Sequence, residues 1–245
     1  MAESEWRCAV ESDESVRLGF CVVNGLRQEH AEELVRQRGE RGFCSLEDFK
    51  QRVALTTDER RALAELGALN CFAAHRRAAL WNVEEPLHND LLGNAHDSRA
   101  PRHSPLAPLT LPERVQADYE RMNLTTGPHP MKLLRQQLPE IWRASDLVEA
   151  PHGATLEIGG NVICRQRPGT AKGFVFISLE DETGVANAIV TPDLFERVRL
   201  VITEEPFLLI EGEVQNTDNV VLVKARKIRP LVHAQLVGSE SHDFR

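Results

Sequence analysis

Residues 173–202 read GFVFISLEDETGVANAIVTPDLFERVRLVI, and this stretch decides the fold of the C-terminal half of the chain. Two runs rich in Val, Ile, Phe and Leu, residues 173–181 and 184–191, are typical of β-strands, and the turn between them predicts a hairpin. Pro192 directly follows the second run. Because proline is favoured in the first turn of a helix, the spacing predicts a helix over 192–202.

Three further β-rich runs surround this stretch. One precedes it and two follow it: TLEIGGNVICRQR (155–167), PFLLIEGEVQ (206–215) and NVVLVKARKI (219–228). Five short strands with one helix between the third and the fourth is the order of an oligonucleotide/oligosaccharide-binding (OB) barrel, which we expect over residues 151–233. Glycines at 160, 173, 184 and 212 fit the bends and turns of such a small closed sheet.

The N-terminal region, residues 1–83, has helical rather than strand-like spacing. Ala31 and Leu34 lie on one apolar face of a predicted helix, Ser45 begins a variant of the capping box, and Thr57 is the expected start of another helix. Helices are predicted in SLEDFKQRV (45–53), TTDERRALAELGAL (56–69) and AAHRRAALWNV (73–83), and in 56–69 the start and stop signals agree. We therefore predict an α+β protein, with an all-α domain followed by a five-stranded barrel.

The remaining segments differ from both domains in composition. Residues 84–111 mix Pro, His, Asn, Asp and Ser without periodicity, so we expect a flexible linker there. We interpret its irregularly spaced histidines as solvated residues rather than metal ligands: His88, His96 and His103. Residues 112–150 are expected to form short connecting helices, and residues 234–245 a frayed tail.

The composition limits the possible classes of protein. A net charge of −8 in 245 residues argues against a protein that coats DNA by bulk electrostatics, so any binding must come from local basic strips or backbone amides. Apolar runs stay well short of the roughly 18–20 residues that span a bilayer, and no membrane contact is expected. The five cysteines form no C-x-x-C pair, which disfavours disulfides or a zinc site and fits a cytoplasmic location.

The stretch CVVNGLRQEHAEELV (21–35) predicts two short helices joined by a glycine turn. Gly25 supplies the backbone freedom of the turn, and the N–H groups from Arg27 and Gln28 to His30 are donors suited to a phosphate oxygen. Arg27 stands where a second glycine would make a better cradle, but it adds a positive charge. Three glutamates follow directly and would repel DNA, so a phosphate clasp and a plain helical corner both remain open.

The predicted barrel carries its own candidate contacts to nucleic acid. The loop between its first two strands, CRQRPGTAKG, places three positive charges around a Pro-Gly turn: Arg165, Arg167 and Lys172. Phe174 and Phe176 share one face of the second strand; they stack on bases if that face is outward, whereas the alternative places Phe176 in the core. Alternation puts Lys224 and Arg226 on one side of the last strand, to contact phosphate or simply to be solvated.

Residues that could carry catalysis are sparse. Glu180, Asp181 and Glu182 form a run of carboxylates, but consecutive strand residues point to opposite faces, which favours a structural hairpin over a metal site. The sequence has no phosphate loop, no G-x-S-x-G and no interpretable Ser/His/Asp set. A complete active site is therefore not expected, and the chain is predicted to be inactive as an enzyme by itself.

Several stretches resemble, in the same order, one family of DNA polymerases. Residues VRLGFCVVNGLRQEHAEELV (16–35), FCSLEDFKQRVALTTDERRALAELGALNCF (43–72) and HRRAALW (75–81) resemble the helix-hairpin-helix region of bacterial C-family replicative polymerases. RRAALW resembles their error-prone, mutagenesis-associated (ImuC-type) branch. Downstream, YERMNLTTGPHPMKLLR (119–135) is similar to the segment before the OB domain of that family, and 161–199 with the strands after it to the OB domain itself.

This resemblance implies the C-terminal region of an error-prone polymerase rather than a whole one. Family members hold Mg²⁺ on three catalytic aspartates N-terminal to this region, and no residues here match those motifs, so no cofactor is expected in this chain. The family assigns the hairpin to duplex DNA and the barrel to single-stranded template or to protein contacts. No glutamine-led, aromatic-ended clamp pentapeptide is recognisable between residues 84 and 111, so clamp binding is not carried over.

We therefore expect sequence-independent binding of DNA, in replication, repair and translesion synthesis. The rival from another class is a docking module for other translesion-synthesis proteins, with vestigial DNA binding; the net charge of −8 supports it. An anticodon-binding barrel of a tRNA synthetase shares the strand pattern but not the preceding helices.

Overall fold

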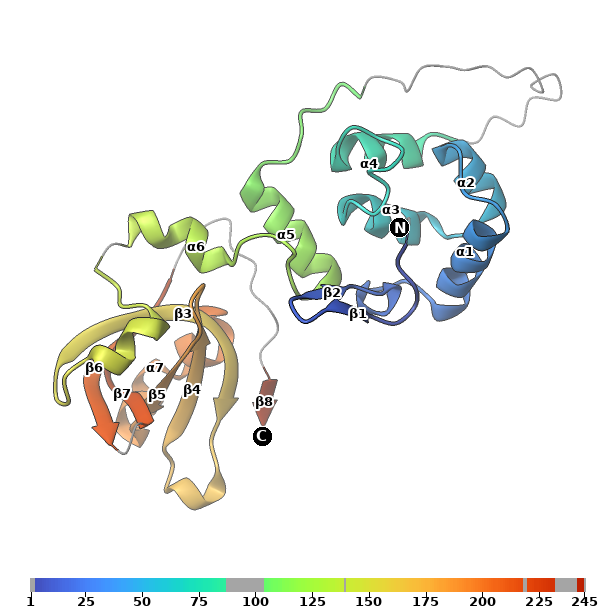
Figure 1. The fold of residues 1–245 in the computed structure, drawn as a ribbon. Helices are drawn as coiled ribbons and strands as arrows, with labels where there is room; N and C mark the ends of the chain where they lie inside the picture. Colours follow the sequence, from blue (N-terminus) through green and yellow to red (C-terminus); the bar gives the residue numbers. More distant parts are fainter. Residues whose placement is uncertain (1–2, 87–103, 139, 218–219, 232–241, 245) are drawn as a thin grey trace, which may run out of the picture. The chain divides into compact units, whose positions relative to one another are not determined.

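The computed structural model describes the chain in five stretches: residues 3–86, 104–138, 140–217, 220–231 and 242–244. Contacts divide the chain into two compact units, Met1–Met122 and Asn123–Arg245. Each unit has a hydrophobic core of its own. The first unit consists mainly of helices and the second contains the barrel (Figure 1). The predicted α+β fold, with helices before the barrel, is confirmed.

The first unit packs helices around one core and begins with a small β-ribbon. Its elements are β1 (Ala9–Ser12), β2 (Ser15–Arg17), the 3₁₀ turn η1 (Phe20–Val22), α1 (Gln28–Glu40), α2 (Leu46–Arg52), α3 (Thr57–Glu65), α4 (Arg76–Glu84) and α5 (Leu111–Met122). The helices bury one apolar face each, with Leu34, Phe49, Leu63 and Ala79 fully buried at the centre. Burial of a large apolar side chain contributes about 1.5–3 kcal/mol, so this core stabilises helices too short to form alone.

Side-chain caps fix where two of these helices begin. The hydroxyl of Ser45 accepts the backbone N–H of Asp48 at 3.1 Å, as the spacing predicts. In α3 the cap is Thr56, one residue before the predicted start at Thr57. Thr56 caps the helix because the side chain of Glu59, three residues later, reaches back to its backbone N–H and completes a capping box.

The segment before α1 differs from the prediction of a short helix. Phe20–Val22 forms only one 3₁₀ turn. Its start is held to residues before β1, because Phe20 N–H donates to the carbonyl of Glu5 and Cys21 N–H to that of Trp6. The β1–β2 ribbon just before it was not predicted, since its strands are too short for periodicity to reveal them. The glycine turn that follows η1 is nevertheless present.

A buried ion pair holds α5 in the first unit. Arg76 Nη1 lies 2.5 Å from Asp118 Oδ1 and also donates to the carbonyl of Glu65, and the two charged side chains are 8% and 2% exposed. The predicted connecting segment 112–150 is thus divided, with α5 in the first unit and the remainder in the second.

The second unit is a five-stranded barrel with short helices around it. Its elements are α6 (Pro130–Leu134), η2 (Arg135–Gln137), η3 (Ala144–Glu149), β3 (Thr155–Gln166), η4 (Gly169–Ala171), β4 (Val175–Glu180), β5 (Val185–Val190), α7 (Pro192–Glu204), β6 (Phe207–Thr217), β7 (Val220–Pro230) and β8 (His242–Phe244). The strand order is β4-β5-β7-β6-β3, and a further pairing between β3 and β4 closes the barrel. The strands and the position of α7 confirm the OB fold.

The long strand β3 makes closure possible because it belongs to both halves of the barrel. Residues 155–161 pair with β6 and residues 161–166 with β4. At the crossing, a Cβ on Gly160 would lie 2.6 Å from the carbonyl oxygen of Glu180, so only glycine permits this approach. Helix α7 contributes buried Leu194 and Phe195 to the same core.

Some predicted features lie outside the described residues. These include most of the linker 84–111 with His88, His96 and His103, and most of the tail 234–245. Within that tail, β8 pairs in parallel with β3. Every helix in the described part of the chain is too short or too polar to cross a membrane.

Candidate nucleic-acid interface

Four strands of the barrel carry a row of outward side chains across its surface. The strand register places Gln166 beside Phe176, Phe176 beside Ile189, and Ile189 beside Lys224. Phe176 is 38% exposed, whereas its neighbours along β4 are buried, so this face points away from the core. The alternative that placed Phe176 inside the barrel is therefore wrong. We call these four residues the sheet row.

Polar and apolar groups flank the sheet row. Next to Phe176 along the same face, the hydroxyl of Ser178 donates to the side-chain oxygen of Asn187 on β5 at 2.8 Å. Val185, further along β5, is 48% exposed. Phe174 precedes β4 and is half-buried. An exposed ring beside amide and hydroxyl groups suits unpaired bases, which stack on aromatic faces and hydrogen-bond at their edges.

Arg165 is the candidate that the structure turns away from the interface. Its Nε donates to the carbonyl of Ile202 at 2.5 Å and its Nη2 to that of Glu205 at 2.7 Å. These carbonyls close the C-terminal end of α7, where a cation also complements the helix dipole. Arg165 therefore serves the barrel as a helix cap.

The other two cations of the loop between β3 and β4 face solvent. The guanidinium of Arg167 lies 4.7 Å from the ring centroid of Phe195, and its Nη2 is 3.7 Å from the carboxylate of Glu196. Lys172 is exposed in the left-handed region at φ 51°, just before Gly173. Both residues lie in the loop between Gln166, at one end of the sheet row, and β4, which carries Phe176.

The outward charges of β7 are partly neutralised. Arg226 Nη2 lies 2.5 Å from Glu213 on the neighbouring strand β6, and Arg229 pairs at 2.9 Å with Glu157 on β3, one strand further on. Lys224 is exposed and has no ion-pair partner among the described residues. Of the two cations predicted on β7, Lys224 is thus the one without an ion pair within the described residues.

The glycine turn before α1 is built as predicted. Gly25 has φ +81°, and a Cβ there would meet nothing within 4 Å, so the turn is open on its outer side. Helix α1 begins after Arg27 without a side-chain cap. The first-turn N–H groups of Gln28 and Glu29 have no acceptor within the described residues. Such donors at a helix N-terminus favour an anion.

A buried carboxylate from α3 reaches this turn. Glu59 accepts the backbone N–H of Arg27 at 3.1 Å, Arg27 Nε at 3.4 Å, and Nδ1 of His30 at 2.8 Å. Burial raises the pKa of Glu59, but hydrogen bonds from Thr56, His30 and Arg27 outweigh it and lower the pKa to about 2. The carboxylate is therefore ionised and holds both basic side chains in place.

The remaining hairpin contacts define what faces solvent. The Arg27 side chain is 58% exposed, and only its Nε contacts Glu59. The Gln28 amide donates to Glu32 on the next turn of α1. Arg27, Gln28 and His30 are thus brought together at the start of α1, and the Arg27 guanidinium is the most accessible positive charge of the three.

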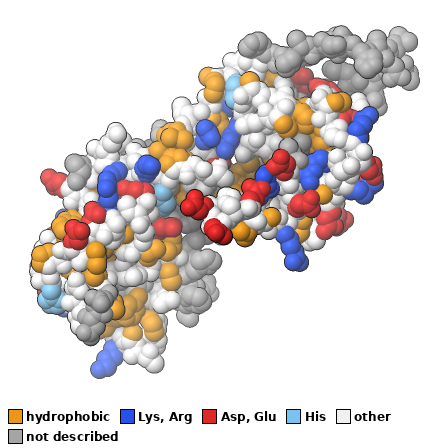
Figure 2. All heavy atoms as spheres, in the orientation of Figure 1, with side chains coloured by type: hydrophobic (Ala, Val, Ile, Leu, Met, Phe, Trp, Pro, Cys, Tyr) orange, Lys and Arg blue, Asp and Glu red, His pale blue; other side chains and the backbone are white. Residues whose placement is uncertain are grey.

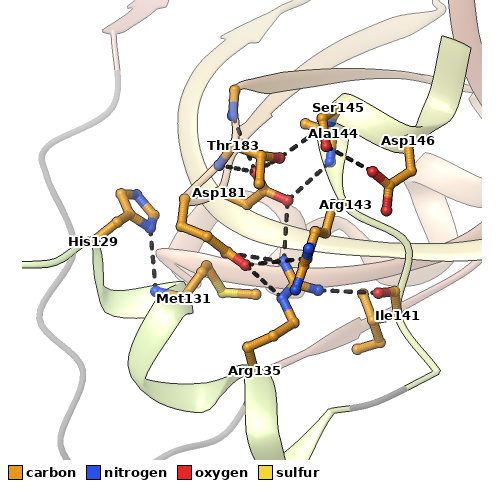
Figure 3. A network of polar contacts seen from close by, with 12 residues as sticks. His129, Met131, Arg135, Ile141, Arg143, Ala144, Ser145, Asp146, Asp181 and Thr183 are labelled. Carbon is orange, nitrogen blue, oxygen red and sulfur yellow. Dashed lines mark hydrogen bonds and ion pairs between the residues drawn. The ribbon is translucent and has the colours of Figure 1, made fainter.

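The run of carboxylates at the β4–β5 turn is structural (Figure 3). Asp181 accepts the N–H of Ala144 at 2.9 Å and the hydroxyl of Thr183 at 2.6 Å. Arg135 binds both carboxylates of the turn, Asp181 at 3.1 Å and Glu182 at 2.7 Å. This network fastens η2 and η3 to the barrel, as expected of a hairpin rather than a metal site. Among the described residues, no group of three or more His, Cys, Asp or Glu side chains is placed to hold a metal ion.

His129 borders the same network. Its Nδ1 accepts the N–H of Met131 at 3.2 Å and caps α6 (Figure 3). Its Nε2 is buried and makes no hydrogen bond within the described residues; Glu180 lies 3.9 Å away. Burial lowers the pKa of His129, and the nearby carboxylates only partly oppose this effect.

Sequence reasoning missed Glu59, Ile189 and Asn187. The T-x-x-E spacing of Thr56 and Glu59 was available as a capping signal, but nothing local indicates that Glu59 contacts α1. Ile189 and Asn187 join the candidate interface only through the register of β5 with its neighbours.

The face of the molecule drawn in Figure 2 carries charges of both signs, shown by its blue and red side chains.

Two family models match the chain and define its class. Residues 1–79 match a model described as a helix-hairpin-helix motif, and residues 157–231 match one described as an OB-fold nucleic acid binding domain. The chain thus joins a helix-hairpin-helix region to an OB-fold nucleic-acid-binding domain.

Nearly the whole chain is similar to one part of error-prone DNA polymerases. It is 37% identical over 233 residues to the enzyme of Anaeromyxobacter sp. (strain K), covering 94% of this chain and 20% of the relative. It is 36% identical over 255 residues to the enzyme of Aromatoleum aromaticum, covering 99% of this chain and 24% of the relative. The chain therefore spans about a fifth to a quarter of the length of these relatives.

Likeness to solved structures is weak. Asparaginyl-tRNA synthetase from Pyrococcus horikoshii gives a TM-score of 0.33 with 21% identity, covering 40% of this chain and 23% of that chain. A likeness at this level supports no conclusion on function.

Proposed function

We propose that this chain is the sequence-independent DNA-binding region of an error-prone translesion polymerase of the ImuC type. In this proposal the hairpin holds duplex DNA, the barrel holds single-stranded template, and both act in the cytoplasm. The sheet row is the observation that carries the proposal. It sets an exposed ring between an amide at one end and a lysine at the other, on a fold whose family is described as nucleic-acid binding.

The barrel offers separate contacts for bases and for phosphates. Phe176 provides a stacking surface, and stacking contributes about 1–3 kcal/mol per base without regard to sequence. Lys224 ends the sheet row, and Arg167 and Lys172 lie on the loop before β4. These three cations can follow the backbone of a strand whose bases lie over Phe176 and Ile189.

The hairpin offers contacts for the backbone of a duplex. The open N–H groups of Gln28 and Glu29 and the exposed guanidinium of Arg27 converge at the start of α1. They read no base and therefore give no sequence preference. Arg27 takes the place of a second glycine by offering a charged donor where a bare amide would otherwise face the phosphate.

Catalysis is not part of this proposal. Mg²⁺-dependent nucleotide transfer belongs to another part of the polymerases that this chain resembles. A primer-extension assay on the purified chain is expected to show no synthesis. Extension above the background of a mock purification would contradict an accessory role.

Fluorescence anisotropy with labelled oligonucleotides tests the proposal directly. We expect weak binding of an oligo-dT single strand and of a short duplex, with affinity that falls steeply between about 50 and 200 mM salt. Two duplexes of unrelated sequence should bind alike. Absent binding, or binding indifferent to salt, would remove the DNA role from the chain.

A docking module for other translesion-synthesis proteins is the second candidate. Ion pairing favours it, because Arg36, Arg41 and Arg61 of the first unit are matched by carboxylates rather than left for phosphate. Charge reversal at Arg167 and Lys172 separates the two functions. Loss of DNA binding supports the first, whereas loss of a protein partner with DNA binding intact supports the second.

A further inference from the structure

The first unit contains a pocket that neither the hairpin nor the barrel uses. It has a volume of about 250 Å³ and lies among α2, α3 and the C-terminal end of α4. Its lining residues are Lys50, Thr57, Arg60, Val83, Glu84, Glu85 and Pro86. Two of its three helices therefore contribute a cation, and Thr57 adds a hydroxyl.

Arg60 presents an unused donor in this region. Its Nε is fully buried and has no hydrogen-bond partner within the described residues, and its Nη2 reaches the hydroxyl of Thr57 only at 3.4 Å. A buried donor without an acceptor lowers stability, and native proteins tolerate such groups where water or a ligand supplies the acceptor.

Lys50 contributes a buried ammonium group to the wall of the pocket. The side chain is buried, and its ammonium donates to the backbone carbonyls of Asn82 and Glu85. Burial lowers the pKa of Lys50 and the charge of Arg60 lowers it further, while Glu47, Glu85 and Glu84 oppose these effects in part. Of the two carboxylates in the lining, Glu84 forms an ion pair with Arg61 outside the pocket.

We propose that this pocket binds a phosphate group between Arg60, Thr57 and Lys50. A tetrahedral oxyanion has acceptors on all sides, so it can meet the Arg60 Nε–H, the hydroxyl and the ammonium together. The group can come from a nucleic-acid backbone or from a free nucleotide. The site lies within the first unit and does not depend on the roles proposed for the hairpin and the barrel.

Nuclear magnetic resonance of the arginine side chains provides the direct test. Inorganic phosphate is titrated into the full chain at constant ionic strength, with sodium chloride as the balancing salt. We expect the Arg60 Nε–H signal and the Thr57 amide signal to shift and saturate. An Arg60 signal that does not move, or that moves equally with chloride, would overturn the proposal in favour of a pocket filled by water.

Thermal unfolding of variants provides the second readout. Phosphate should raise the Tm of the wild-type chain at matched ionic strength. R60Q should need about ten times more phosphate for the same rise in Tm. R36Q is the matched control, because it removes the same charge from an exposed site on α1 and should respond like wild type. An unchanged response in R60Q, or an equal effect of acetate on the wild type, would reject phosphate as the ligand.

Titration with two further ligands then identifies the source of the phosphate group. A single-stranded oligonucleotide that shifts the Arg60 signal assigns the site to a nucleic-acid backbone. A shift with a nucleoside monophosphate but none with the oligonucleotide assigns it to a free nucleotide. DNA affinity of R60Q measured by anisotropy keeps the two proposals apart, since the barrel contacts remain intact in this variant.

Discussion

The carboxylate of Glu59 and the backbone N–H of Arg27 are joined by a 3.1 Å hydrogen bond across 32 residues of sequence. The same carboxylate closes the capping box of α3 through Thr56. One side chain therefore fixes the beginnings of two helices. Contacts within the protein therefore shape the hairpin, and under the proposed function its exposed donors need little reordering to meet a phosphate.

Replacement of Glu59 tests this double role. E59Q should reduce the free energy of unfolding by about 3 kcal/mol at pH 7, because the pKa of the native carboxyl is about 2 against 4.5 when free. A lowered pKa gives stability that is full above pH 4.5 and is lost as the pH falls toward 2. Urea unfolding of both proteins across this range measures it. E32Q, on the exposed surface of α1, is the control and should change little.

Arg27 should matter for binding and not for folding. R27Q removes an exposed charge, so we expect the Tm to move by little while duplex affinity falls and the salt slope decreases by about one ion. Anisotropy with a short duplex across a salt titration checks this. R36Q, an exposed arginine further along α1, serves as the matched variant. An equal loss of duplex affinity in R27Q and R36Q would mean that binding depends on the net charge of the first unit and not on the position of Arg27.

Phe176 should dominate the affinity of the barrel for single strands. F176A removes an exposed ring, so single-strand affinity should fall by about 1–3 kcal/mol with no loss of stability. The control is L200A, which removes a more exposed apolar side chain, 69% accessible, from α7. If L200A weakens binding as much as F176A does, the sheet row is not the binding surface.

The three basic residues at the end of β3 and in the β3–β4 loop should separate into two kinds. R165Q should destabilise the barrel by about 1–3 kcal/mol, because the carbonyls that end α7 lose a charged donor. R167Q and K172Q should keep the stability and each lower the salt slope of DNA binding by about one. Chemical unfolding and a salt titration on the same preparations test both halves. A stable R165Q protein with weak DNA binding would instead return Arg165 to the interface.

His129 should make the barrel sensitive to mild acid. Its pKa in the folded protein lies below the free value of 6.5, so the unfolded chain takes up the proton first. Stability is therefore full above pH 6.5 and declines as the pH falls through the folded value. H129N keeps a side chain that can cap α6 but cannot titrate. Its unfolding free energy should fall less than that of wild type between pH 7.5 and 5.5, and parallel curves would contradict the assignment.

The parts of the fold that follow from local sequence were predictable. Pro192 and the β-rich runs around it place α7 and its neighbouring strands, and Ser45 marks the start of α2. Strand alternation also placed Lys224 on an outward face, but it left open whether the face of Phe176 points outward or into the core. These features depend on residues a few positions apart, within reach of period and capping rules.

Other parts of the candidate interface depend on contacts between distant residues. From the sequence alone, Arg165 and Arg167 are equivalent candidates for a contact to nucleic acid. In the structure Arg165 contacts the C-terminal end of α7, whereas Arg167 lies over the ring of Phe195. Glu59 lies on α3 and contacts the start of α1 only because these two helices pack together in the folded unit. Hydrophobic and charge patterns cannot resolve such choices, since both outcomes agree with the local sequence.

The two-sided pairing of β3 has a consequence for synthesis of the chain. β3, β4 and β5 can form a meander as soon as they leave the ribosome, but the pairing of Asn161 with Phe207 must wait for β6. During that interval the inner faces, with Ile158 and Ile177, lack their partners from β6 and β7. Long-range pairing of this kind folds slowly and exposes apolar strands meanwhile. The barrel is thus the part of the chain whose yield should depend most on chaperones and on the rate of translation.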